Sequence, residues 1–247
     1  MKTQEKNFDG IKLSGFTAIL IMLALTGTAI YLLSLPQTPS IIAGVICGIC
    51  VVVMLPGFMI IQPNNSRVLT FFGRYAGTVI SNGFYWVNPL FLKSTVTLRI
   101  LNLNIDPIKV NDKVGNPIMI GAVVVWRIKD TYKASFDISG NIREFVQIQS
   151  DAALRQVAGM YAYDTNETID KVTLRSDESG EITQRLEDEL NSRLAIAGIE
   201  IVEARINYLA YASEIASVML RRQQADAIIS ARERIVEGAV SMVHLAL

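Results

Sequence analysis

The sequence lacks charge over a long N-terminal stretch, because no Asp, Glu, Lys or Arg occurs between Lys12 and Arg67. Two apolar runs, Leu13–Leu35 and Ser40–Gln62, make up most of this stretch, and a short break with two prolines separates them. As a helix, each run would extend about 35 Å, enough for a hydrocarbon core of about 30 Å. A soluble helix of this length normally keeps a charged face. The sequence therefore predicts a transmembrane hairpin over residues 13–62.

A cleaved signal peptide is the main alternative for the first run, but its apolar region is too long and a second run follows directly. Basic residues flank the hairpin on both sides. Lys2, Lys6 and Lys12 precede it and Arg67 and Arg74 follow it, whereas the loop between the runs is uncharged. Positive charge marks the cytoplasmic side of a membrane. We therefore expect an integral membrane protein of the plasma or inner membrane, with two spans, a cytoplasmic segment 1–12 and both termini in the cytoplasm.

Histidine is scarce, and this leaves little for catalysis. The single histidine, His244, lies near the end of an expected helix. Ser176 and Ser179 lie in an acidic loop, without a nearby histidine or a glycine-rich oxyanion turn. The sequence contains no phosphate-binding loop, dinucleotide fingerprint or zinc-protease motif. We therefore predict a protein without enzyme activity, and we expect no catalytic residue, metal ion or cofactor.

Cysteine is also scarce, since the only two are Cys47 and Cys50 inside the second apolar run. Apolar surroundings raise the pKa of a thiol and leave it inert, so packing explains this pair better than redox or metal chemistry. Gly44 and Gly48 lie four residues apart in the same run, a spacing that lets helix backbones approach closely in a membrane. We expect these glycines at a helix–helix contact.

The remainder of the chain, from residue 67, is long enough for one domain with a core and a helical extension. It carries nearly equal numbers of acidic and basic residues. Nucleic-acid binding needs a basic face, so no nucleic-acid partner is expected.

Residues 67–129 show the patterns of strands. The alternation from Thr95 to Ile105 changes parity, as a β-bulge would cause. Residues 118–128 are apolar on nearly both faces, which predicts a central strand covered on both sides. Helical stripes follow over 141–161 and 181–197, with Gly198 ending the second, and a last strand over 199–208. We expect an α+β domain over 67–210, an open sheet with helices on one side.

Residues 212–247 contain no proline and predict one long helix. With Ile215 as position a of a heptad, most a and d positions are apolar, as in the seam of a coiled coil. Arginines at 222 and 232 weaken this reading, and a helix that packs on its own domain remains an equal alternative. The candidate residues of an oligomer seam are Ile215, Val218, Ala225, Ile229, Val236 and Ala239.

Four motifs resemble those of the SPFH or Band 7 family, which includes stomatins, prohibitins and flotillins. The stretch Asn82–Pro89 reads NGFYWVNP, and a strand ending in VWRIKD at Asp130 follows it. Ala153–Gly159 resembles the "LR..hG" helix of the family, where h is an apolar residue, and Leu190–Ile206 resembles a later helix and strand. The order of these elements, from about Arg67 onward, carries the resemblance.

The resemblance implies an oligomeric scaffold attached to the lipid bilayer. Such scaffolds assemble into large homo-oligomers, organise a membrane microdomain and regulate client membrane proteins. A dedicated accessory or regulatory subunit of one membrane protease or transporter is the alternative. Aromatic residues early in the domain, Trp86 and Phe91 above all, are candidates for contact with the membrane interface, where aromatic side chains are favoured. Membership of the domain core is the competing explanation for them.

Overall fold

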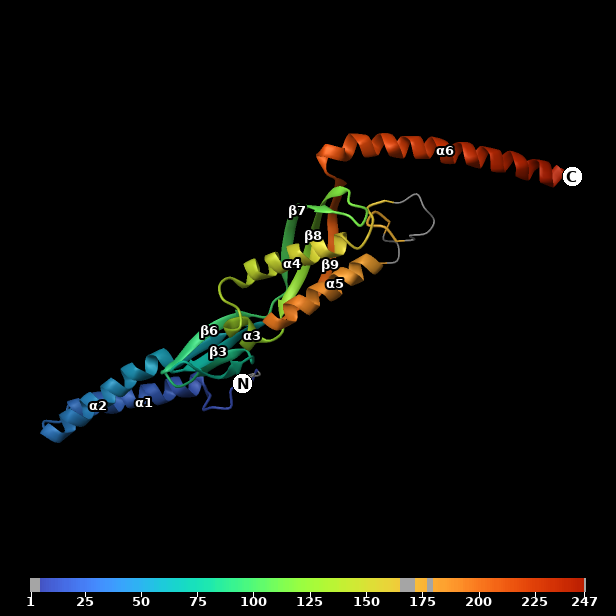
Figure 1. Cartoon of the computed structure of the whole chain (residues 1–247). Helices are drawn as coiled ribbons and strands as arrows, with labels where there is room; N and C mark the ends of the chain where they lie inside the picture. The colour runs from blue at the N-terminus through green and yellow to red at the C-terminus, as the bar shows by residue number, and fades with distance from the viewer. Residues whose placement is uncertain (1–4, 165–171, 177–179, 247) are drawn as a thin grey trace. The chain divides into compact units, whose positions relative to one another are not determined.

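The structure is a computed structural model that describes residues 5–164, 172–176 and 180–246 (Figure 1). The chain divides into two compact units. The first comprises Met1–Leu101, Arg127–Ile142 and Ala195–Glu200, and the second comprises Asn102–Trp126, Arg143–Leu194 and Ile201–Leu247. Together they give the mixed helix-and-sheet fold that the sequence predicts, with two apolar helices near the N-terminus and one long helix near the C-terminus.

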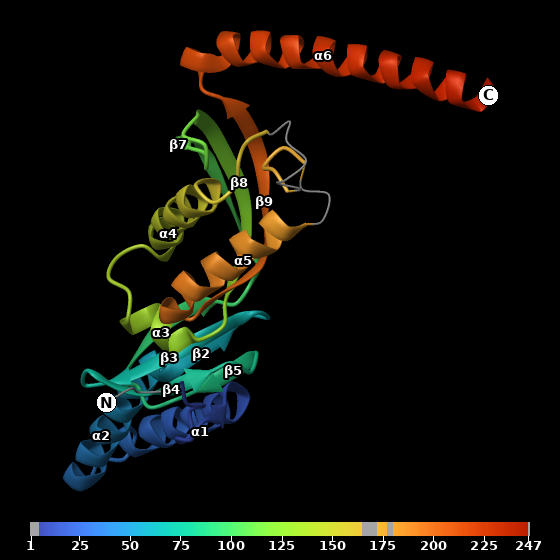
Figure 2. The same cartoon turned by 45° about the vertical axis from the view of Figure 1, so that its right-hand side comes forward.

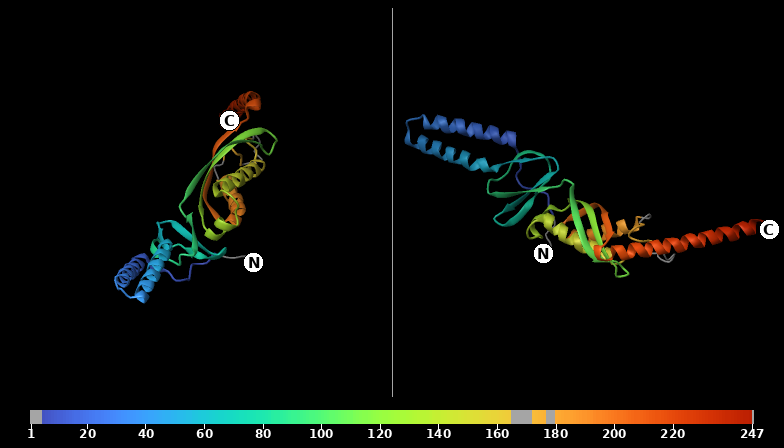
Figure 3. Two further views of the ribbon diagram at one scale, coloured as in Figure 1. Left: turned by 90° about the vertical axis from the view of Figure 1, so that its left-hand side faces the viewer. Right: turned by 90° about the horizontal axis from the view of Figure 1, so that it is seen from above.

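The first unit begins with the two apolar helices, α1 (Gly15–Leu33) and α2 (Thr38–Met54), which lie side by side as a hairpin (Figure 3). A short 3-10 turn, Leu55–Gly57, ends the second helix. Both are long and apolar enough to cross a membrane, and only 11% of each apolar window is buried within the chain. The second helical run ends five residues before the expected Gln62. Pro56 and Gly57 end it, and the residues that follow form a strand.

Two three-stranded sheets complete this unit, in the orders β1-β5-β2 and β4-β3-β6. Their strands are β1 (Leu13–Ser14), β2 (Phe58–Ile61), β3 (Asn65–Phe71), β4 (Arg74–Val79), β5 (Gly83–Trp86) and β6 (Phe91–Thr97). The short helix α3 (Thr131–Phe136) contacts β3. A core cluster of buried side chains draws on both sheets and the segment after β5; it consists of Met59, Ile61, Leu69, Val79 and Val87.

The second unit is built on a sheet of order β7-β8-β9. The strands are β7 (Leu101–Asn111), β8 (Pro117–Ile128) and β9 (Ile199–Tyr211). Two helices, α4 (Ile142–Ala158) and α5 (Glu181–Leu194), lie on one face of it (Figure 2). Strand β8 is central, as predicted. However, only one of its faces is fully covered, because the two helices lie on that face. On the other face the side chains of Met119, Val123 and Val125 are only half-buried.

The parity change before Ile105 is not a bulge. Strand β6 ends at Thr97 in one sheet, and β7 begins at Leu101 in another, so the change marks the passage between sheets. The prediction of a single open sheet over residues 67–210 is therefore wrong, since the strands of this range are divided among three sheets. Gly198 does end the α5 region, after a 3-10 turn over Ala195–Ala197. Its φ of +68° suits glycine, and a Cβ there would lie 2.6 Å from the carbonyl oxygen of Asp130.

The last element is α6 (Ser213–Ala246), one continuous helix of 34 residues (Figures 1 and 3). At 1.5 Å per residue it is about 50 Å long. Every side chain from Ala227 to Leu245 is exposed.

Candidate membrane-anchoring site and self-association helix

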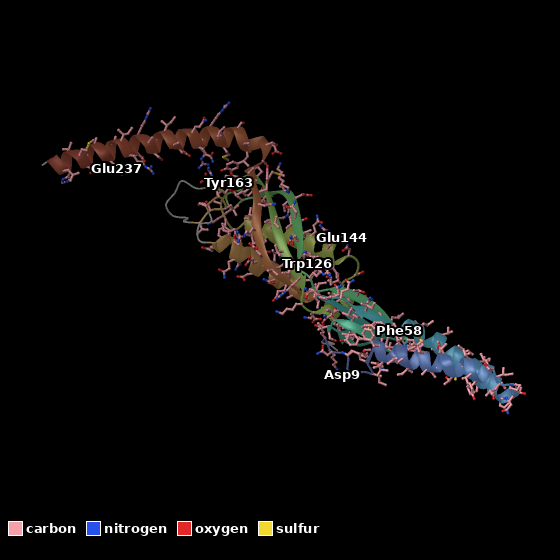
Figure 4. The ribbon with its side chains drawn as sticks, turned by 180° about the vertical axis from the view of Figure 1, so that it is seen from behind. Asp9, Phe58, Trp126, Glu144, Tyr163 and Glu237 are labelled. Carbon is pink, nitrogen blue, oxygen red and sulfur yellow. The ribbon has the colours of Figure 1, made fainter. Side chains whose placement is uncertain are left out.

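Strand β5 pairs with the strands at both ends of the apolar hairpin. The residues just before α1 form β1, and Leu13 pairs with Trp86. After α2, the residues that follow the 3-10 turn form β2, and Phe58, labelled in Figure 4, pairs with the same Trp86 from the other side. Because β5 lies between β1 and β2, the chain enters and leaves the hairpin from one sheet.

Two side chains of this unit bind the carbonyl groups at the end of α2. The Nε1 of Trp86 donates a 2.9 Å hydrogen bond to the oxygen of Met54. The Nζ of Lys93 donates to the oxygens of Pro56, at 2.5 Å, and Phe58, at 3.3 Å. The last carbonyls of a helix have no partner within it, so Trp86 and Lys93 supply donors that the helix lacks. Burial, and to a lesser degree the nearby charge of Arg67, lowers the pKa of Lys93.

The segment that precedes α1 forms part of the same unit. Asn7 makes a parallel bridge with Thr78 of β4. The N–H of Phe8 donates to the oxygen of Thr78 at 3.1 Å, and the N–H of Thr78 donates to the oxygen of Lys6 at 2.9 Å. The ring of Phe8 packs against the core cluster and meets Phe91 edge-on, with centroids 5.4 Å apart.

Side chains fix this segment further. The buried hydroxyl of Thr131 donates to Oε1 of Glu5 at 2.6 Å and lies 3.0 Å from the buried hydroxyl of Thr78. The Nζ of Lys12 donates to Ser81 and lies 4.7 Å from the ring centre of Tyr85. Sequence reasoning treated residues 1–12 only as a charged flank. The one signal of docking was Phe8, a large apolar residue in a polar segment.

The two candidates for the membrane interface occupy different places. Trp86 lies half-buried at the end of α2, whereas Phe91 is half-buried against the core cluster and Phe8. The centre of the Phe91 ring also lies 5.3 Å from the centre of the Phe71 ring. The most exposed aromatic residue nearby is Phe72, at 77%, in the turn between β3 and β4. Its φ of +44° is rare for a bulky residue. Lipid contact at Trp86 and Phe91 remains a prediction.

The model of the SPFH domain / Band 7 family matches residues 59–239, which is most of the chain. The chain belongs to the SPFH/Band 7 family. Members are generally non-enzymatic scaffolds that associate with membranes and typically form oligomers. The match runs from β2 into α6 and leaves the apolar hairpin outside the family domain. A comparison with curated proteins found no match.

In this SPFH/Band 7 protein the two expected helix-packing glycines behave differently. A Cβ on Gly44 would lie 2.8 Å from Cγ of Leu33 and 3.2 Å from the oxygen of Ala29, so Gly44 lies against α1. A Cβ on Gly48 would meet nothing within 4 Å. Within one chain, therefore, Gly44 lies at the contact of the two apolar helices and Gly48 does not. A role for Gly48 in contacts between copies stays a prediction.

The candidate seam of the SPFH/Band 7 chain lies along α6, the helix that carries Glu237 in Figure 4. Ile215 is half-buried where the helix begins, and the other five seam residues are exposed. The apolar surface is wider than the seam, because a second row at the same spacing of seven flanks it. Sequence reasoning missed this row, which consists of Ile228, Ile235 and Met242.

The described part of this SPFH/Band 7 chain holds no group of three His, Cys, Asp or Glu side chains that could bind a metal ion. His244 is exposed on α6. The hydroxyl of Ser176 lies 2.8 Å from that of Thr173, across a short turn. Ser179 and its acidic neighbours Asp177 and Glu178 lie outside the described residues.

Proposed function

We propose that this SPFH/Band 7 chain is a non-enzymatic scaffold with two membrane spans that assembles into a large homo-oligomer, organises a membrane microdomain and regulates client membrane proteins. Both termini lie in the cytoplasm, and the membrane is the plasma or inner membrane. The parts are a cytoplasmic segment 1–12, a transmembrane hairpin within 13–62, the family domain over 67–210 and an oligomerisation helix over 212–247.

The docked N-terminal segment supports this topology. Residues 6–8 bind β4, and the strands on either side of the hairpin both pair with β5. Segments that share hydrogen bonds lie on the same side of a membrane, so the chain crosses it an even number of times. The basic residues Lys6, Lys12 and Arg67 favour the cytoplasmic side.

A cysteine-labelling experiment tests the topology. Cys47 and Cys50 are first replaced by serine, and Asp9→Cys and Gln37→Cys are then introduced separately. A maleimide that cannot cross membranes should label Gln37→Cys in intact cells and Asp9→Cys only after permeabilisation. Labelling of Asp9→Cys in intact cells would contradict the proposal.

The observation that carries the self-association proposal is the exposed apolar surface of α6. Val236 is 62% exposed, and Ile229 and Val243 are exposed to a similar degree at the same spacing of seven. Apolar side chains at this spacing pack best against another helix with the same repeat. A neighbouring copy of α6 supplies such a helix, which agrees with the oligomers that family members typically form.

The mass of the protein in mild detergent, measured by size-exclusion chromatography with light scattering, tests self-association. The wild-type chain, expressed alone, should form a large oligomer. Ile229→Glu combined with Val236→Glu should break it down to small species, because buried unpaired charges are costly. Ala227→Glu combined with Ser230→Glu adds the same charge away from the seam and should leave the oligomer intact.

A monomeric or dimeric wild-type chain would overturn autonomous assembly. It would favour the alternative, a dedicated accessory subunit of one membrane protease or transporter that needs its client for stability.

A further inference from the structure

Two cations lie together on one face of the β4-β3-β6 sheet. Arg67 of β3 pairs with Thr95 of β6, and Leu69 pairs with Lys93, two residues away on each strand. Side chains at alternate positions of paired strands point to the same face, and diagonal neighbours lie about 7–8 Å apart. Arg67 and Lys93 are therefore neighbours, and both are half-buried.

Neither cation has a carboxylate partner among residues 5–164, 172–176 and 180–246. Lys93 uses two of its three donors on the carbonyls of Pro56 and Phe58. Arg67 makes no side-chain hydrogen bond in the same part of the chain. Two like charges at this spacing repel each other, and partial burial strengthens the repulsion. A bound anion would remove this unfavourable term and satisfy the free donors.

The position of the pair indicates which anion is at hand. The carbonyls that bind Lys93 belong to the turn that ends α2 and to the residue after it, where the proposed span leaves the hydrocarbon core. Exposed apolar side chains lie beside them, Leu55 in the turn and Ile60 in β2. The cytoplasmic leaflet is rich in anionic lipids. A lipid phosphate lies at the level of the headgroups, with acyl chains beside such apolar residues.

We propose that Arg67 and Lys93 form a binding site for a phosphate ester, supplied by the headgroup of an anionic phospholipid at the end of α2. The guanidinium of Arg67 binds two phosphate oxygens, as its planar fork favours, and the third donor of Lys93 binds another. The site fixes the height of the sheet relative to the bilayer and selects anionic lipids around each subunit. It rests on the proposed topology, which places the end of α2 at the cytoplasmic surface.

Fluorescence quenching in lipid vesicles tests the site, because Trp86 lies at the end of the same helix. The full chain is reconstituted in phosphatidylcholine vesicles that contain either brominated phosphatidylglycerol or brominated phosphatidylcholine at equal mole fraction. The wild type should be quenched more strongly by the brominated phosphatidylglycerol. Arg67→Gln combined with Lys93→Gln should abolish this preference. The loss of a charge-assisted contact corresponds to about a tenfold weaker preference.

Arg74→Gln combined with Arg99→Gln is the matched control, since it removes the same charge from exposed positions of the same unit. The control should keep the preference. Equal quenching of the wild type by both lipids would overturn the proposal, and so would equal loss in both double variants, which would indicate general charge attraction.

Thermal unfolding in detergent distinguishes a lipid from free phosphate. Short-chain phosphatidylglycerol should raise the unfolding temperature of the wild type but not of the Arg67→Gln, Lys93→Gln variant, and short-chain phosphatidylcholine should raise neither. Equal stabilisation by inorganic phosphate would assign the site to a free anion and overturn the lipid assignment. Failure of the proposed topology or oligomer would instead appear in the labelling and mass measurements, whatever the lipid charge.

Discussion

The indole nitrogen of Trp86 donates a hydrogen bond to the carbonyl oxygen of Met54, at the last residue of α2. Trp86→Phe removes this donor but keeps an aromatic ring. We expect the variant to lose about 1–2 kcal/mol of stability and the end of α2 to fray. Hydrogen exchange of the amides of Met54, Leu55 and Gly57 should become faster in the detergent-purified protein. Trp126→Phe is the control, because the buried Nε1 of Trp126 has no partner in the described structure, and it should leave these amides unchanged.

Gly77 permits the docking of the N-terminal segment. A Cβ on Gly77 would lie 2.7 Å from Cα of Phe8, so Gly77→Ala should expel the segment and speed cleavage by trypsin after Lys6. Gly73→Ala is a matched control, since Gly73 also has positive φ but open space around it. Both variants should lose about 1–2 kcal/mol from backbone strain, but only the first should release the backbone at Lys6 from β4 and so make it open to cleavage. Equal cleavage of the two would contradict the docking.

Asp112 organises the turn between β7 and β8. Its carboxylate accepts hydrogen bonds from the backbone N–H groups of Val114, Asn116 and Tyr163 and from the side-chain amide of Asn116, at 2.7–3.1 Å. Asp112 is buried, so Asp112→Ala leaves these donors unpaired and should cost about 3 kcal/mol. Chemical unfolding checks this loss, with the exposed neighbour Asn111→Ala as the control. A loss no greater than that of the control would be inconsistent with this role.

We expect the ionised form of Asp151, on α4, to lower the stability of the protein at neutral pH. Burial raises its pKa above the ordinary 3.8, Arg155 partly opposes this shift, and Asp106 adds to it. A raised pKa in the folded state means that stability is highest at low pH and falls as the pH rises through this range. Asp151→Asn should therefore be more stable than the wild type at pH 7.

The measurement is the difference in unfolding free energy between Asp151→Asn and the wild type, across a pH series. The difference should shrink as the pH falls from neutral toward 3.8, where the native carboxyl is protonated. The exposed Asp188→Asn on α5 is the control. A variant that is less stable than the wild type at pH 7 would show that the ionised carboxylate is favourable in the fold.

Local patterns in the sequence predicted the elements that depend on local patterns. Two uncharged apolar runs predicted α1 and α2. Apolar residues at a spacing of four predicted α5, and Gly198 predicted its end; the four apolar residues are Ile182, Leu186, Leu190 and Leu194. The alternation near Leu98 was ambiguous because a bulge and a passage between two sheets both change which face is buried. Only the pairing of β6 with β3, and of β7 with β8, distinguishes them.

The candidate site was less predictable, because long-range contacts build it. The sequence indicates Trp86 only as an aromatic residue close to an apolar run, and no pattern in it indicates that the indole nitrogen binds Met54. Lys93 and Arg67 lie far apart in sequence and meet only through the register of β3 and β6. The docking of Phe8 on β4 depends on the absence of a side chain at Gly77, about seventy residues later. The resemblance to the family implied a scaffold, but it did not indicate these contacts.

The pairing of β5 with both β1 and β2 has a mechanical consequence. A membrane helix on a flexible tether can tilt without disturbing the domain that follows it. Here α1 follows β1 directly and α2 leads into β2 through one 3-10 turn, and both strands flank β5. In the proposed topology, a tilt of the hairpin would therefore apply a torque to the sheet. Changes in bilayer thickness or curvature would thereby be converted into strain in a folded domain. In the proposed assembly of many copies these torques would add, and the stiffness of the subunits would resist bending of the membrane beneath them.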